Sequence, residues 1–348
     1  EILTLVSSPS YDPSLLVGRV RSSNFARLQA DTVKPLFDRA LMASYPPGST
    51  FKIMNGLIGL QEEVIRPTSL FSCNYGYHAG SITVGCHAHR SPLDLPDAVA
   101  QSCNSWFCNA FRNILENSDY ESVQEAYDRW REYLVAFGFG NKLGIDLPNE
   151  LPGFVPARSY YDRYYGKDRW KALTVISLAI GQGEIGATPL QMANMAAVIA
   201  NRGSFYIPHV IKKIGEDGTP SPLYTQRYTT GISAGNFEPV IEGMEGAVNG
   251  GEGSTARGAR LDSIIICGKT GTAQNPHGKD HSIFVAFAPR DNPQIAIAVY
   301  VENAGFGSTF AAPIASLMIE KYLTGTIKRK YLEDYVLRVV IKPDAEKE

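Results

Sequence analysis

Strand-like segments gather near the C-terminal end of this 348-residue chain, while helical patterns fill its middle. Residues 262–270, 281–288 and 294–302 are rich in β-branched and apolar residues, and a hairpin-like stretch with Asp, Asn and Pro joins the last two. Residues 2–7 alternate weakly and predict one more strand near the N-terminus. Strands at both ends predict one antiparallel sheet built from the termini, with a helical lobe inserted between them: an α+β fold.

Helical periodicity predicts the elements of that lobe. Residues 49–63 are apolar almost all round, so we expect a central, buried helix. A later helix has well-marked ends, because Thr188 is a good N-cap, Pro189 takes the first helical position and Gly203 follows the end. The other expected helices cover residues 35–44, 94–117, 119–137 and about 309–323.

Composition excludes several classes of protein. Hydrophobic residues make up 44% of the chain, charged residues 20%, and the net charge is −2, which is typical of a globular domain. Near-neutral charge without basic runs argues against a nucleic-acid partner. No apolar run reaches the roughly 18 residues of a membrane span, and no signal peptide is visible. We therefore expect a fragment of a longer protein whose targeting segment is missing.

The sequence Tyr-Pro-Pro-Gly-Ser-Thr-Phe-Lys at residues 45–52 places a hydroxyl and an amine three residues apart at a predicted helix start. Positions i and i+3 share a helix face, so Lys52 lies near Ser49. A serine becomes a nucleophile when a base takes its proton, and a buried lysine with a lowered pKa can be that base. The alternative is an ordinary N-cap, because Ser-x-x-Lys also occurs by chance.

Two further triplets favour catalysis. Ser102-Cys103-Asn104 begins a helical stretch, and Lys269-Thr270-Gly271 follows an apolar strand. Each triplet alone is weak evidence. Ser-x-x-Lys, Ser-x-Asn and Lys-Thr-Gly in this order form the signature of penicillin-binding proteins and class A β-lactamases, which are serine acyl transferases.

Longer stretches extend the similarity over almost the whole chain, which resembles the transpeptidase domain of class B penicillin-binding proteins, the elongation type called penicillin-binding protein 2. The resemblance implies a single domain, 1–348, with a penicillin-binding protein/serine β-lactamase-like α+β fold: a five-stranded antiparallel sheet flanked by helices. The sheet lobe would cover about 1–45 and 205–325, and the mostly helical lobe about 46–204. The stretches that carry the resemblance are residues 5–16, 45–52, 102–107, 137–150, 181–203, 268–278 and 281–305.

The resemblance also implies a reaction. Ser49 would attack the carbonyl of the penultimate D-alanine of a peptidoglycan stem peptide, and Lys52 would take its proton. Ser102 would relay a proton to the departing D-alanine. Asn104 would hydrogen-bond the acyl-side amide of the substrate, and Lys269 would supply positive charge near Ser102 and the substrate carboxylate.

Further roles fall on the Lys-Thr-Gly strand. Thr270 and Thr272 would hydrogen-bond the substrate carboxylate, and Gly271 would let the substrate backbone lie against the strand edge. The backbone N–H groups of Ser49 and Thr272 would form the oxyanion hole. The acyl group would then pass to an amine of a neighbouring stem peptide, while β-lactams would acylate the same serine and leave slowly.

Three cysteines and a histidine raise the question of a metal. Cys73, Cys86, His89 and Cys103 form a ligand set used by structural zinc. Their spacing is long and irregular, and His87 is an alternative to His89. The resemblance implies a structural zinc beside the active site and no organic cofactor, although this chain has cysteine where relatives have aspartate. A metal at Cys103 would fix the backbone of the Ser-x-Asn triplet.

Two alternatives to a metal remain open. The cysteines could be ordinary core residues, or two of them could form a disulfide in an oxidising compartment. Cys108 and Cys267 are interpreted as structural.

Other groups are less informative. An aromatic stretch is interpreted as a packed edge of the lobe, with a substrate groove as the alternative. His277 and His281 are expected at the surface, and nothing in the sequence marks Glu184 as a base that activates a deacylating water. The aromatic stretch consists of Tyr160, Tyr161, Tyr164, Tyr165 and Trp170.

The resemblance implies peptidoglycan stem peptides, β-lactams, a SEDS-type glycan polymerase and other elongation-complex membrane proteins as partners. A membrane anchor and a non-catalytic pedestal would precede residue 1 and hold the domain in the periplasm. Two alternatives keep the acylation: a D,D-carboxypeptidase or β-lactamase, in which water takes the acyl group, and a non-catalytic β-lactam sensor.

Overall fold

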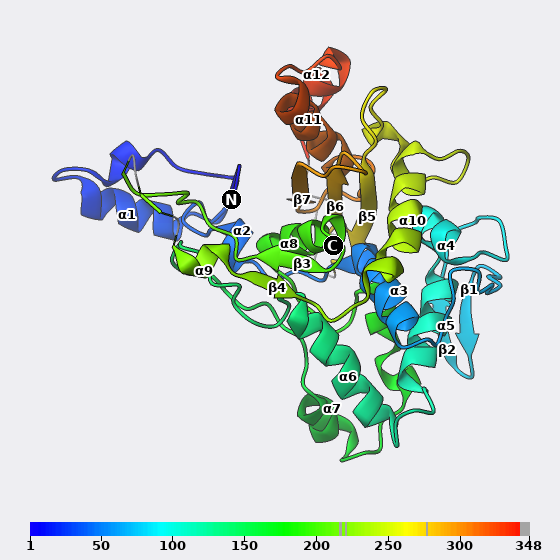
Figure 1. The fold of residues 1–348 in the computed structure, drawn as a ribbon. Helices are drawn as coiled ribbons and strands as arrows, with labels where there is room; N and C mark the ends of the chain where they lie inside the picture. The colour runs from blue at the N-terminus through cyan, green and yellow to red at the C-terminus, as the bar shows by residue number, and fades with distance from the viewer. Residues whose placement is uncertain (216–217, 220, 276–277, 342–348) are drawn as a thin grey trace, which may run out of the picture.

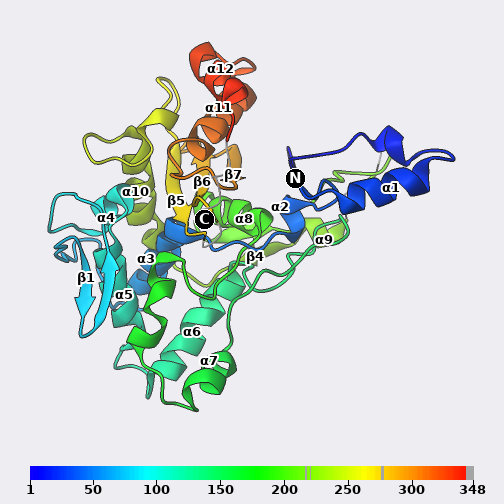
Figure 2. The ribbon, with the colours of Figure 1, turned by 180° about the vertical axis from the view of Figure 1, so that it is seen from behind.

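The central feature of the computed structural model is an antiparallel sheet with helices on both faces (Figures 1 and 2). Its three strands, in the order β5–β6–β7, are Cys267–Ala273, His281–Ala288 and Ile295–Val301. The three C-terminal strand predictions are therefore confirmed, the first with its bounds shifted towards the C-terminus. The structure describes all residues except 216–217, 220, 276–277 and 342–348.

The middle strand, β6, is buried on both sides because alternate side chains face different layers. Phe284 and Ala286 belong to a core shared with α11 (Ala311–Thr324). Val285 and Phe287 face the main core, to which α8 (Pro189–Ala200) and α10 (Phe237–Asn249) contribute. Burial on both faces explains why this segment reads as an almost continuous apolar run.

Helix α3 (Lys52–Gln61) runs through the middle of the molecule (Figure 1). Every residue from Lys52 to Leu60 is buried, which confirms the predicted central helix. The short 3₁₀ helix η2 (Gly48–Phe51) leads directly into it. The elements that pack around α3 include α4 (Leu95–Gln101), α5 (Asn104–Leu115), α6 (Val123–Ala136) and η3 (Ala172–Ile180).

The remaining elements lie nearer the periphery. Helix α8 has the predicted cap, in which Thr188 and Gln191 form a reciprocal capping box. No helix in the described part of the chain is long and apolar enough to cross a membrane. The peripheral elements are η1 (Pro13–Leu16), α1 (Arg21–Ala30), α2 (Arg39–Met42), β1 (Gly76–Ala79), β2 (Ile82–Gly85), α7 (Arg158–Tyr165), β3 (Ser204–Tyr206), α9 (Pro222–Thr225), β4 (Arg227–Thr229), η4 (Ala234–Asn236), η5 (Arg257–Ala259) and α12 (Lys330–Arg338).

The expected α+β class is confirmed, but the expected five-stranded sheet is not. The described residues form a three-stranded sheet and two separate two-stranded ladders, β1–β2 and β3–β4. Residues 2–7 form no strand: Ile2 and Leu5 pack against the main core and the Ile2 N–H donates to the His209 carbonyl at 2.7 Å, but within the described residues no ladder continues from this bond. Weak alternation makes a strand only where a partner strand is within reach.

Three helix predictions also need correction. The expected helix at 94–117 is broken at Ser102, which has a positive φ of 58°. The expected helix at 35–44 is reduced to the four residues of α2. Helix α10 was not predicted, because two glycines and a proline are poor helix formers, and packing on α4 and β5 overrides that preference.

The two histidines near the Lys-Thr-Gly strand have different outcomes. His277 lies outside the described residues. His281 is half-buried rather than at the surface, because it begins β6 and packs against the rings of Tyr45 and Tyr300.

Candidate active site

The turn that carries Ser49 is held between the sheet and the segment that follows η3. Gly48 has a φ of +55°, and a side chain there would begin 2.7 Å from the carbonyl oxygen of Thr272. Its N–H donates to the carbonyl of Gly181 at 2.9 Å. Only glycine fits this approach, so the turn fixes the position of the half-buried Ser49 next to β5.

Four of the predicted residues meet in one hydrogen-bonded cluster. Lys52 Nζ donates to the Ser102 carbonyl at 2.6 Å, to Ser102 Oγ at 3.1 Å and to Asn104 Oδ1 at 2.5 Å. Lys269 Nζ donates to the same Ser102 Oγ at 2.8 Å. Ser49 lies one turn before Lys52 on the continuous η2–α3 segment, but its hydroxyl has no hydrogen-bond partner among the described residues. Ser49 and Lys52 are therefore neighbours along the helix, but the Ser49 hydroxyl and the Lys52 amine form no hydrogen bond.

Ser102 owes its place to an unusual backbone conformation. Its φ of 58° and ψ of 42° are left-handed, which a residue with a side chain rarely adopts. This conformation ends α4 and turns the chain directly into α5, whose N-cap is Cys103. The break aims the Ser102 hydroxyl at both lysines, and strained residues of this kind persist where the surroundings hold them in place.

Burial lowers the pKa of both amines. The pKa of Lys52 falls to about 8, mainly because the side chain is fully removed from water. Burial, followed by the nearby Lys52 charge, holds the pKa of Lys269 well below its usual value. The lowered pKa weakens the preference of Lys269 for the charged form that is expected at this position. A bound carboxylate would favour the protonated form again.

The pKa of Lys52 predicts a pH dependence of acylation. If the neutral amine is the base, the rate of acylation by a β-lactam should rise with pH, with a midpoint near 8. An unshifted lysine would instead give a midpoint above pH 10. Stopped-flow measurement with a chromogenic cephalosporin between about pH 6 and 9.5 checks this. A rate that is flat or falls over that range would contradict the assignment of the base.

The edge strand β5 presents unpaired backbone groups to the Ser49 turn. The carbonyl of Thr272 accepts a hydrogen bond from Gln182 Nε2 at 3.3 Å, so it points away from β6. In an antiparallel ladder the N–H and C=O of one residue point to the same side. The N–H of Thr272 therefore also faces the free edge, on the side that an oxyanion hole requires.

Gly271 has a different role from the expected one. A side chain at this position would begin 2.8 Å from the Thr50 methyl group and 3.2 Å from the carbonyl oxygen of Pro47. The space above it is filled by the chain itself and not left for a substrate backbone. Gly271 therefore lets η2 pack on β5, while nearly buried Thr270 and half-buried Thr272 flank it.

Asn104 forms three hydrogen bonds within the protein, and its Nδ2 keeps one further N–H. Its Oδ1 accepts from Lys52, and its Nδ2 donates to the carbonyl of Gly85 at 2.6 Å. Its backbone N–H donates to Cys86 Sγ at 3.2 Å. Asn104 therefore connects the lysine to the neighbouring cysteine segment.

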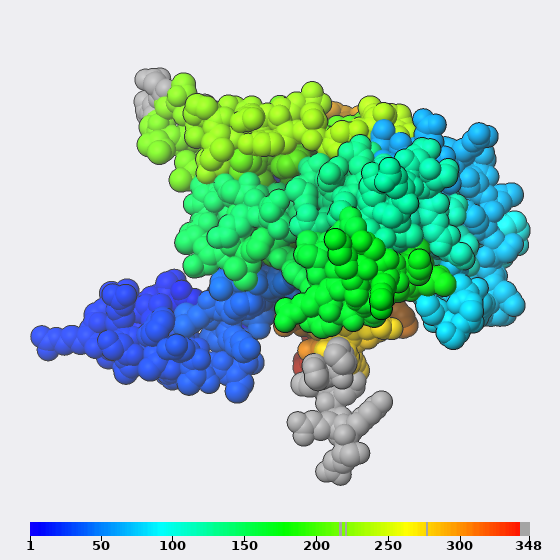
Figure 3. All heavy atoms as spheres, turned by 90° about the horizontal axis from the view of Figure 1, so that it is seen from below, coloured from blue at the N-terminus to red at the C-terminus, as the bar shows by residue number. Residues whose placement is uncertain are grey.

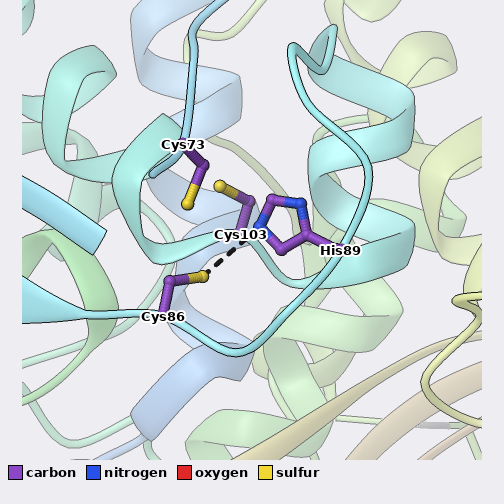
Figure 4. Close-up of side chains that lie close together, drawn as sticks. All are labelled: Cys73, Cys86, His89 and Cys103. Carbon is purple, nitrogen blue, oxygen red and sulfur yellow. Dashed lines mark hydrogen bonds between the residues drawn. The ribbon is translucent and has the colours of Figure 1, made fainter. Parts of the chain in front are cut away.

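The four candidate metal ligands converge on one point (Figure 4). One ligand atom from each of Cys73, Cys86, His89 and Cys103 lies within 4.8 Å of all the others. A tetrahedral zinc has bonds of about 2.3 Å to sulfur and 2.0–2.1 Å to nitrogen, so this set has the chemistry and spacing to hold one.

Hydrogen bonds around the cluster favour the ligand forms of its side chains. His89 Nδ1 lies 2.6 Å from the carbonyl of Arg90, to which it must donate, and this leaves Nε2 as the free ligand atom, 3.4 Å from Cys86 Sγ. Cys103 Sγ accepts from the Trp106 N–H at 3.3 Å. A hydrogen bond from the Cys103 thiol holds the pKa of the Cys86 thiol well below its ordinary value.

The structure distinguishes the two candidate histidines of this cluster. His89 belongs to it, whereas His87 only packs edge-on against the His89 ring. All five cysteines are free. Cys108 and Cys267 are buried away from the cluster, as predicted.

Residues 1–320 match the family described as the penicillin binding protein transpeptidase domain. The chain belongs to this family. Peptidoglycan D,D-transpeptidase MrdA from Acinetobacter baumannii is 34% identical over 93% of the chain, and MrdA from Haemophilus influenzae is 31% identical over all of it. The alignments cover 49% and 54% of those relatives, so this transpeptidase domain spans about half their length.

Solved structures share the fold of the transpeptidase domain. Pseudomonas aeruginosa PBP2 in complex with WCK 5153 has a TM-score of 0.80 and 33% identity, covering 94% of this chain and 70% of that one. The Helicobacter pylori complex of PBP2 and MreC gives 0.78 and 27%, covering 93% and 58%. The imipenem acyl-enzyme of penicillin-binding protein A from M. tuberculosis gives 0.72 and 27%, covering 92% and 70%.

Two residues of the transpeptidase site were missed in the sequence. Buried Asn55 donates to the carbonyls of Leu178 and Ala179 and accepts from Trp130 Nε1, and so ties α3 to the segment before Gly181. Gln182 bonds the edge of β5. The sequence could have indicated Asn55, because it is a polar amide within an otherwise apolar helix pattern. Nothing in the sequence indicated Gln182.

Proposed function

We propose that this domain is a peptidoglycan D,D-transpeptidase with Ser49 as its nucleophile. The observation that carries the proposal is the pair of buried lysines sharing the Ser102 hydroxyl beside the Ser49 turn. The family relationship and the MrdA relatives support the same reaction.

In the first half-reaction, Ser49 Oγ attacks the carbonyl of the penultimate D-alanine while Lys52 takes the hydroxyl proton. The N–H groups of Ser49 and Thr272 stabilise the oxyanion. The C–N bond breaks, and the leaving D-alanine nitrogen gains a proton through Ser102. Ser102 suits this relay because its oxygen contacts both amines.

In the second half-reaction, an amine of a neighbouring stem peptide attacks the acyl-enzyme. The new amide bond forms, the ester to Ser49 breaks, and the amine proton returns to Ser49 through Lys52. Thr270 and Thr272 lie on β5 to bind the donor carboxylate before D-alanine leaves, and Lys269 compensates its charge. β-Lactams acylate Ser49 by the first half-reaction, as the mycobacterial acyl-enzyme illustrates for that protein.

One experiment separates this function from its alternatives. Incubation with a D-Ala-D-Ala pentapeptide and an amine acceptor should release D-alanine and form a cross-linked product, both visible by mass spectrometry. D-alanine release without the product would favour a carboxypeptidase. Fast nitrocefin turnover would favour a β-lactamase, and a stable adduct without any peptide turnover would favour a sensor.

The proposal extends to the cellular setting of the domain. The domain would act in the periplasm, anchored to the inner membrane, during cell elongation with a SEDS-type glycan polymerase. One structural neighbour is a PBP2 in complex with MreC, and another belongs to a study of a peptidoglycan synthase complex. Co-purification of the full-length protein with such a polymerase tests this.

The Cys73, Cys86, His89 and Cys103 cluster would hold a structural zinc. Bound zinc neutralises the thiolates and fixes the segments that carry them. Because Cys86 Sγ accepts from the backbone of Asn104, the cluster holds the Ser-x-Asn triplet in place. The cluster thus takes part in orientation, not in the acyl transfer itself.

Metal analysis checks the zinc proposal. Protein purified without chelator should contain about one zinc per chain, and Cys86→Ala should lower that content several-fold, since it removes one of four ligands. Cys267→Ala, a buried cysteine outside the cluster, should leave the zinc content unchanged. A Cys–Cys cross-link among the four positions, found by mass spectrometry, would contradict it.

A further inference from the structure

A hollow of about 290 Å³ lies beside α7, and nothing in the acylation chemistry uses it. It is lined by Tyr160, Tyr164, Tyr165 and Glu184, and we name it the tyrosine hollow. Tyr164 and Tyr165 are 64% and 51% exposed, whereas the lobe-edge packing expected of this stretch is provided by buried Tyr161 and Trp170. The aromatic stretch therefore has a packed side, which fits the expected lobe edge, and an open side that faces the hollow.

Glu184 gives the hollow its chemical character. Its Oε2 accepts from the hydroxyl of buried Tyr161 at 2.9 Å, which fixes the carboxylate in place. Within the described ranges Glu184 forms no ion pair, so its charge is uncompensated by the protein. A carboxylate among tyrosine rings matches an organic ammonium, which gains a charge-assisted hydrogen bond and cation–π contact.

The tyrosine hollow is connected to the active site through a short segment. The Gly181 carbonyl accepts from Gly48, next to the nucleophile, and Gln182 donates to the edge of β5 at Thr272. Glu184 follows only three residues after Gly181, a reach of at most about 11 Å. Green atoms of this part of the chain border the yellow and orange atoms of the sheet segment (Figure 3).

We propose that the tyrosine hollow binds the ammonium group of the acceptor stem peptide before that amine attacks the acyl-enzyme. The inference rests on the proposed transpeptidation, in which the acceptor reacts through its side-chain amine. An amine is mostly protonated in water near neutral pH, so a site for the cation gathers the acceptor near the segment that contacts the Ser49 turn.

Binding of an acceptor tripeptide tests the proposal directly. The probe is N-acetyl-L-alanyl-γ-D-glutamyl-diamino acid, in which the side-chain amine is the free one, titrated into the protein by calorimetry or NMR. Glu184→Gln should weaken binding about tenfold, because the amide keeps the hydrogen bond from Tyr161 but loses the charge. Tyr164→Ala should weaken it about threefold and Tyr164→Phe hardly at all, since the ring face is the partner.

Matched controls decide the outcome. Glu242→Gln removes one carboxylate from the exposed side of α10 and should bind like the wild type. The probe acetylated on its side-chain amine should not bind. Equal affinity in Glu184→Gln, equal binding of the acetylated probe, or no binding to the wild type would each overturn the proposal. Because binding needs no acylation, these results are independent of penicillin labelling, which tests the nucleophile.

Discussion

Replacing Ser49 with alanine is expected to abolish covalent labelling of the domain by a fluorescent penicillin. The β-lactam can acylate the protein only at an oxygen in this position, next to the Thr272 N–H at the free edge of β5, where that oxygen attacks the lactam carbonyl and the ring C–N bond breaks. The loss should be at least about 10⁴-fold, because removal of a nucleophile leaves only binding and the oxyanion hole. In-gel fluorescence after a timed incubation measures it.

A nearby serine provides the control for this result. Ser44→Ala, an exposed hydroxyl five residues earlier, should label at the wild-type rate. The melting temperature of Ser49→Ala should stay close to that of the wild type, since the Ser49 hydroxyl has no hydrogen bond to lose within the described residues. Labelling that persists in Ser49→Ala, with the adduct mapped by mass spectrometry to another residue, would show that the nucleophile lies elsewhere.

The catalytic triplets were predictable because each combines local residues with local geometry. Ser49 and Lys52 are one helical turn apart in any helix, and the apolar residues just before β5 predicted a strand there, with bounds shifted towards the N-terminus. Helix α3 and strand β6 were equally predictable from the sequence, since an element buried on all sides leaves a continuous apolar run. These features require no knowledge of distant parts of the chain.

The features that the sequence did not predict depend on contacts between segments that are distant along the chain. The left-handed Ser102 interrupts a helical pattern that has no Gly or Pro to reveal the break. Gly271 suggested room for a substrate, but in the structure it packs against Thr50, which is more than 200 residues away in the sequence. The choice of His89 over His87 depends on the Arg90 carbonyl that fixes the imidazole ring. A sequence pattern contains none of these tertiary constraints.

The same limit applies to the two lysines. Sequence placed Lys52 beside Ser49 and Lys269 beside Ser102, but their hydrogen bonds show that both amines converge on Ser102. Two ammonium groups sharing one hydroxyl oxygen repel each other, which favours a neutral amine at one of them. A lysine that is neutral before the substrate binds, and can therefore take a proton, is thus favoured by the convergence of the three motifs and not by any one of them.

Replacing Lys52 with alanine is expected to lower the rate of penicillin acylation by about 10²–10⁴-fold, the usual range for loss of a general base. The buried amine also donates to Ser102 and Asn104, so the variant leaves their oxygens without this partner. The loss has two possible physical sources: the missing base and the displaced Ser-x-Asn triplet. Stopped-flow kinetics on Lys52→Ala alone cannot separate them.

Lys52→Arg separates them, because arginine keeps the positive charge and the donors but cannot act as a base near neutral pH. If Lys52 only holds the triplet, Lys52→Arg should recover much of the rate. If Lys52 is the base, Lys52→Arg should stay within about tenfold of Lys52→Ala, and the rise of the rate with a midpoint near pH 8 should disappear in both. A Lys52→Arg enzyme with near wild-type rate and pH profile would move the base to Lys269, the other buried amine that contacts Ser102.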